Sequence, residues 1–82
     1  MNTFEYLADI EQAANHYETA WVLADARETN EVANSLIKKH HAIAEKIMEK
    51  ISKEYDKKLP QVRKDVMQYM DNSSEFIRSI NR

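Results

Sequence analysis

Residues 31–58 read EVANSLIKKHHAIAEKIMEKISKEYDKK, and apolar side chains recur in them every three or four positions. This spacing is the period of an amphipathic α-helix, whose apolar side chains gather on one face. The members of the stripe are Ala33, Ile37, His40, Ala44, Ile47, Ile51 and Tyr55, widened by Leu36, Ile43 and Met48. The stripe predicts a long helix over 31–58. Pro60 should end it, because a proline disfavours helical geometry in the residue before it.

The segment before it has the same period and predicts a helix over about 3–28. Its stripe consists of Leu7, Ile10, Ala14, Tyr17, Trp21 and Ala24. Asn2 and Glu5 have the spacing of a capping box at the start of this helix. Asn30 is the candidate break before the next helix, because asparagine tolerates the left-handed conformation that ends helices. We expect Trp21 to be a core residue.

The segment after Pro60 predicts a third helix over 60–80, with the proline as its first residue. Its apolar stripe is Leu59, Val62, Val66, Tyr69, Met70, Phe76, Ile77 and Ile80. The stripe crosses a polar stretch in which Asn72 and Glu75 repeat the capping-box spacing. We favour one helix here, with a break at 71–74 as the alternative.

The chain of 82 residues has no glycine, no cysteine and one proline. Tight hairpins that need positive φ, glycine-rich phosphate loops and disulfide scaffolds are therefore excluded. We predict an all-α fold with a single domain over 1–82, made of three long amphipathic helices in an antiparallel bundle. The alternative is a helical hairpin that oligomerises. A core of this size barely offsets the entropy lost on folding, so we expect a homo-oligomer or a protein partner.

Charge is distributed unevenly along the chain. Residues 1–31 hold seven acids against one base, a balance of −6, whereas residues 32–64 hold nine bases against four acids, a balance of +5. Antiparallel neighbours of opposite sign explain this pattern without an external ligand. Glu49–Lys53 and Glu54–Lys58 have the spacing of intrahelical ion pairs, and we expect Lys57 and Lys58 to be solvated. The basic Lys38–Lys64 region leaves a small nucleic-acid-associated regulator as an alternative function.

Sites for catalysis, cofactors and metals are not indicated by the residues present. The serines have no strained turn with a base beside them, the carboxylates of the first helix are scattered among polar positions, and so small a chain can hardly enclose a substrate pocket. We predict that the protein is not an enzyme. His40 and His41 are adjacent and diverge on a helix, so they do not share one ion. His40 lies on an apolar stripe, and we expect a hydrogen-bonded core histidine rather than a ligand or a pH switch.

The surplus of large apolar side chains points to binding of another protein, because aromatic residues and methionine are enriched at interfaces. The candidate partner-binding residues are Tyr6, Met67, Met70 and Phe76. The start of the chain lacks the pattern of a secretory signal and no apolar run is long enough to span a membrane, so we expect a cytoplasmic protein without direct membrane insertion.

Three segments carry a family resemblance: MNTFEYL (1–7), NSLIKKHHAIAEKIMEKI (34–51) and EYDKKLPQVRKDV (54–66). Over essentially its whole length the chain resembles the rIII antiholins, the small cytoplasmic lysis-inhibition proteins of T-even phages. The resemblance implies a phage protein in the host cytoplasm that binds the cytoplasmic segment of a holin and delays lysis. It transfers no functional residue to this chain. A helical inhibitor or immunity protein against another target has the same sequence requirements.

Overall fold

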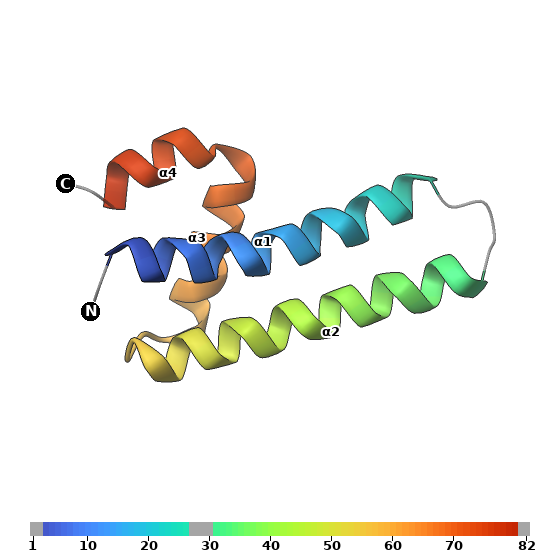
Figure 1. Ribbon diagram of the computed structural model, residues 1–82, viewed down its shortest axis with the longest axis horizontal. Helices are drawn as coiled ribbons and strands as arrows, with labels where there is room; N and C mark the ends of the chain where they lie inside the picture. The colour runs from blue at the N-terminus through green and yellow to red at the C-terminus, as the bar shows by residue number, and fades with distance from the viewer. Residues whose placement is uncertain (1–2, 27–30, 81–82) are drawn as a thin grey trace.

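The computed structural model describes residues 3–26 and 31–80, and they form four helices: α1 (Thr3–Ala26), α2 (Glu31–Glu54), α3 (Leu59–Asp71) and α4 (Ser73–Ile80). The all-α prediction is confirmed, but the count of three helices is wrong. α1 and α2 run antiparallel side by side, α3 crosses one end of this hairpin, and α4 turns back along the same end (Figure 1). The predicted caps at Asn2 and Asn30 lie outside the described residues.

α2 ends four residues earlier than predicted. Asp56 has φ 51°, which is the left-handed conformation that commonly ends a helix. The Lys57 N–H then donates to the Ser52 carbonyl at 3.0 Å, the bond of a Schellman motif, and the Ser52 hydroxyl donates to the Lys57 carbonyl at 2.5 Å. Aspartate takes the position that glycine usually occupies, because its short polar side chain tolerates this conformation. Pro60 therefore does not end α2; it is the second residue of α3.

The third predicted helix is two helices, and the break at 71–74 is the correct alternative. Asn72 caps α3 at its C-terminus, where its N–H donates to the Gln68 carbonyl at 2.9 Å. The same residue caps α4 at its N-terminus, because its side-chain oxygen accepts from the Glu75 N–H at 3.1 Å. Asn72 Nδ2 also contacts the Glu75 carboxylate at 3.4 Å. The predicted Asn72–Glu75 spacing thus marks a new helix start rather than a kink.

The core lies at the end of the hairpin that α3 and α4 cover. It draws on all four helices and contains Tyr6, Ile10, Ala13, Ala14, Met48, Ile51, Val62, Val66 and Phe76. Ala13 and Ala14 are fully buried. Such small side chains let neighbouring helices approach closely, because interaxial distance depends on the residues at the contact.

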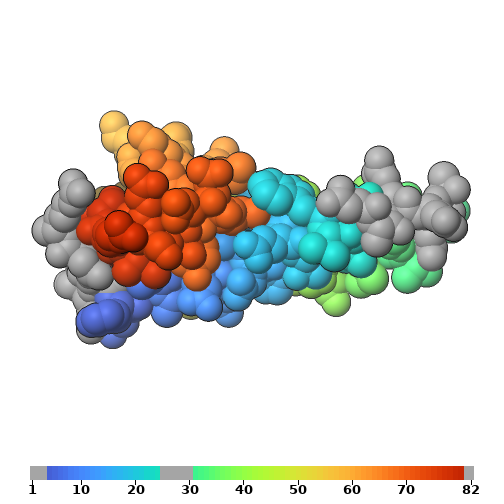
Figure 2. All heavy atoms as spheres, turned by 90° about the horizontal axis from the view of Figure 1, so that it is seen from above, coloured from blue at the N-terminus to red at the C-terminus, as the bar shows by residue number. Residues whose placement is uncertain are grey.

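Beyond this core the hairpin continues as two helices alone. Both views show α1 and α2 projecting past α3 and α4 (Figures 1 and 2). Ala20 on α1 and Ala44 on α2 are the last buried residues towards the turn, and the described side chains of 21–24 and 31–43 are all exposed or half-buried. We call residues 16–26 of α1 together with residues 31–43 of α2 the arm, and the rest of the described chain the base.

Candidate functional site

The four predicted partner-binding residues fall in different environments. Tyr6 is 3% exposed and Phe76 is also buried, so both belong to the core and offer no surface to a partner. Met70 is half-buried against the core, and Met67 on α3 is 49% exposed. The structure therefore leaves Met67 as the surface-accessible member of the set. The sequence could not separate these residues, because a single helical stripe does not reveal how far each position is covered.

Tyr6 serves a structural purpose at the base. Its hydroxyl donates to the carboxylate of Asp65, which is 7% exposed and also accepts from Gln61 Nε2 at 2.9 Å. The Tyr6 ring packs edge-on against Tyr55 at 5.1 Å, and Lys57 Nζ lies 4.1 Å from the ring centroid. Burial, followed by the bond to Asp65, raises the pKa of Tyr6. The expectation of a solvated Lys57 is therefore wrong, since this cation stacks on Tyr6, whereas Lys58 is exposed as predicted.

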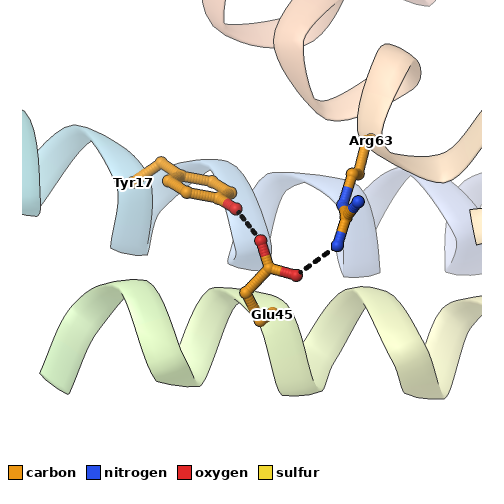
Figure 3. A network of polar contacts seen from close by, with 3 residues as sticks. All are labelled: Tyr17, Glu45 and Arg63. Carbon is orange, nitrogen blue, oxygen red and sulfur yellow. Dashed lines mark hydrogen bonds and ion pairs between the residues drawn. The ribbon is translucent and has the colours of Figure 1, made fainter. Parts of the chain in front are cut away.

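A second polar network joins three helices where the arm meets the base. The Tyr17 hydroxyl of α1 donates to Glu45 Oε1 of α2 at 2.6 Å, and Arg63 Nη2 of α3 donates to Glu45 Oε2 at 2.8 Å (Figure 3). The Tyr17 hydroxyl and the Arg63 guanidinium hold the pKa of Glu45 below its usual range. Burial and the bond to Glu45 raise the pKa of Tyr17 to about 12. The three side chains therefore bridge α1, α2 and α3.

The three histidines are also placed by the α1–α2 hairpin. His16 Nδ1 and His40 Nδ1 are 3.0 Å apart and both rings are half-buried, with centroids at 5.2 Å and an interplanar angle of 29°. His41 points elsewhere, edge-on to the Tyr17 ring at 5.2 Å. His40 is hydrogen-bonded as expected, with His16 as its partner, but it is half-buried and does not belong to the core. The pairing depends on the register of α1 against α2, which the helical period of either segment does not contain.

The arm carries large apolar side chains that this chain does not bury. Trp21 is 46% exposed, Val22 is more exposed still, and Leu36 on α2 is exposed as well. The expectation that Trp21 is a core residue is wrong. The apolar stripe of α1 continues past Tyr17 to Trp21, but α3 crosses the hairpin at the base and does not cover this part of the stripe. A stripe without a covering helix is typical of a surface that binds another protein.

Four of the five lysines of α2 share one exposed helix face. Lys39, Lys46, Lys50 and Lys53 are all exposed, and their spacing of seven, four and three residues places them on one helix face. Within residues 3–26 and 31–80 the ion pair present is Arg63–Glu45. The predicted Glu49–Lys53 pair is not formed. The predicted Glu54–Lys58 pair has no helix to support it, because α2 ends at Glu54.

A partly open depression of about 310 Å³ lies at the elbow between α3 and α4. Phe76 is its apolar member, and the remaining lining is polar, formed by Gln68, Asp71, Asn72, Glu75 and Ser79. Its charged side chains are the carboxylates of Asp71 and Glu75, both of which are exposed residues.

In the part of the chain that the structure describes, no three His, Cys, Asp or Glu residues are grouped so that they could hold a metal ion. None of the described helices is long and apolar enough to cross a membrane. No family model, curated protein or solved structure matches the chain.

Proposed function

We propose that this protein is a non-enzymatic interaction module that docks an amphipathic helical segment of a partner protein on its arm. The observation that supports the proposal is the set of exposed apolar side chains on the arm, Trp21, Val22 and Leu36, which lies beyond the core that α3 and α4 cover. Tryptophan is the residue type most enriched at binding hot spots. A docked helix would remove these side chains from water, and each Å² of apolar surface so buried contributes roughly 25 cal/mol.

The partner that we propose is the cytoplasmic segment of a holin, as the resemblance to the rIII antiholins implies. The protein would then reside in the cytoplasm of a phage-infected cell. By binding the free holin segment it would lower the concentration of holin able to assemble in the membrane, and lysis would be delayed. The delay is limited by the difference in its affinity for free and assembled holin.

The test is binding of the purified soluble segment of a T-even holin to the full chain, with Trp21→Gln and Val22→Gln as arm variants. Met67→Gln is the matched control, since Met67 is as exposed as Trp21 but lies on α3. We expect the arm variants to keep the helical circular dichroism spectrum and to lose affinity by about tenfold or more, with Met67→Gln close to wild type. If only Met67→Gln lost affinity for the segment, the docking surface would lie on α3 and not on the arm.

Failure of the wild-type protein both to bind the segment and to alter lysis timing would remove the holin as partner. Mass measurement by light scattering, made in parallel, reports whether a second copy occupies the arm instead. In that case the arm variants would lower the mass of the assembly, while Met67→Gln would not.

The exposed lysine face of α2 supports a second candidate, association with nucleic acid. Lys39, Lys46, Lys50 and Lys53 are free of ion pairs among the described residues and could follow a phosphate backbone. Salt separates this function from helix docking. Binding through phosphates collapses between about 50 and about 200 mM salt, whereas an apolar interface persists. Lys46→Gln with Lys50→Gln should abolish nucleic-acid retention and leave binding of the holin segment unchanged.

A further inference from the structure

The contact between His16 and His40 joins α1 to α2 near the level where buried packing stops. The two Nδ1 atoms are 3.0 Å apart. A hydrogen bond at this distance needs a proton on one Nδ1 atom and a lone pair on the other. The contact therefore exists while at least one of the two imidazoles is neutral, and it is lost when both are protonated.

The neighbourhood of the pair cannot absorb a second positive charge. The residues one helical turn away are uncharged: Gln12, Ala13, Thr19 and Ala20 on α1, and Leu36, Ile37, Ile43 and Ala44 on α2. The titratable or charged residues that flank the pair in sequence are Tyr17 on α1 and Lys39 and His41 on α2. Glu45 on α2 already accepts from Tyr17 and from Arg63 on α3. Among the described residues no carboxylate is paired with either imidazole, so two imidazolium rings would repel each other across the 3.0 Å contact.

The arm depends on this contact more than the base does. The base is held by the four-helix core and by the buried Tyr6–Asp65 bond, whereas the arm rests on α1–α2 contacts that bury no described side chain beyond Ala20 and Ala44. Local opening is governed by the contacts of the segment that opens. Repulsion placed between His16 and His40 therefore acts on the weakest part of the fold.

We propose that the His16–His40 pair is a proton-operated latch of the arm. When one imidazole is neutral, the bond and the stacking of the rings hold α1 and α2 together. When both imidazoles are protonated, the bond is replaced by repulsion and the arm opens while the base stays folded. Histidine suits this role because its charge changes between about pH 5 and pH 8. The inference goes beyond the proposed function and does not depend on it, because the latch is a property of the protein alone.

Amide hydrogen exchange read by NMR on the full chain tests the latch. Protection factors, corrected for the pH dependence of intrinsic exchange, are compared at about pH 7.5 and about pH 5, with the amides of the base as internal reference. We expect protection in the arm to fall by about tenfold or more relative to the base. The proposal would be overturned if amide protection fell equally in the arm and the base between the two pH values, or if it fell in neither.

Variants assign the effect to the pair. His16→Gln and His40→Gln each leave a single imidazole, so the pH dependence of arm protection should disappear in both. His41→Gln is the matched control, since His41 packs on Tyr17 instead, and it should keep the full response. A response that survives in His16→Gln and His40→Gln would refute the latch. If either variant proves too unstable to study, ring ¹⁵N spectra of the wild-type protein decide: the Nδ1–Nδ1 hydrogen bond of His16 and His40 must be present at about pH 7.5 and absent at about pH 5, and an unchanged signal contradicts the proposal.

Discussion

Removing the Tyr6 hydroxyl should measure how much the hydrogen bond between Tyr6 on α1 and Asp65 on α3 stabilises the fold. In Tyr6→Phe the ring keeps its edge-on contact with Tyr55 and its place beneath the Lys57 ammonium, and only the bond to Asp65 is lost. Asp65 then retains Gln61 as its hydrogen-bond partner at a site that is 7% exposed. A hydrogen bond to a charged group is worth about 1.5 to 3 kcal/mol, and a buried acceptor that loses its partner cannot recover that energy from water. We expect Tyr6→Phe to lower the free energy of unfolding by about 2 kcal/mol.

Urea denaturation followed by circular dichroism at neutral pH is the assay, and a loss of this size lowers Tm by about 10 °C in a domain of this length. Tyr55→Phe is the matched control. Its hydroxyl donates to Asp9 at 2.9 Å from a half-buried position, so its removal should cost about 1 kcal/mol or less. The denaturant slope should be unchanged in both variants.

A double-mutant cycle with Asp65→Leu completes the test. Replacing both partners leaves no buried acceptor unsatisfied, so the double variant should be more stable than the two single losses predict. A loss below about 0.5 kcal/mol in Tyr6→Phe, or additive effects within about 0.5 kcal/mol in the cycle, would refute a stabilising Tyr6–Asp65 bond.

Three further predictions follow from the core, the Glu45 network and the α4 cap. Ile10→Ala should lower the free energy of unfolding by about 3 to 4 kcal/mol, because Ile10 is fully buried. Trp21→Ala should lower it by about 1 kcal/mol, because the indole is 46% exposed. Urea denaturation of both variants checks that Ile10→Ala is the less stable of the two. Tyr17 and Arg63 lower the pKa of Glu45, so ionised Glu45 stabilises the folded protein fully above the ordinary carboxyl value of 4.5. This stabilisation is lost as the pH falls through the lowered pKa. The urea midpoints of wild type and Glu45→Gln should therefore converge in acid. Asn72→Ala should cost about 1 kcal/mol through loss of the α4 cap, seen as a lower urea midpoint and faster exchange of the first amides of α4.

Much of the secondary structure could be predicted from local chemistry. The helical period of residues 31–58 and the absence of glycine predict helices, and Asn72 with Glu75 offered the start of α4 as an alternative to one continuous helix. The end of α2 was harder to predict, because the left-handed residue is Asp56, which is an uncommon choice, while Pro60 is a familiar signal four residues downstream of the observed end. α2 therefore ends through the Schellman motif at Asp56 and not through the steric effect of Pro60 on the residue before it.

The candidate sites depended on distance between helices, which periodicity does not contain. Trp21 lies on the apolar stripe of the first helix and Tyr6 lies beside that stripe, yet Tyr6 is buried and Trp21 is not. The difference arises because α3 packs across the base and stops short of the arm. Likewise, His16 and His40 are unremarkable in sequence, and their pairing follows from the register of two antiparallel helices.

The amino-acid sequence by itself determined that this protein is helical and which faces of its helices are apolar, because both depend on interactions within a few residues. The tertiary structure alone decided which apolar residues are covered, that Asp65 is buried against Tyr6, and that two histidines share one hydrogen bond. Those features depend on where α3 crosses the hairpin and on the register of α1 against α2, which are set by packing between segments far apart in the chain.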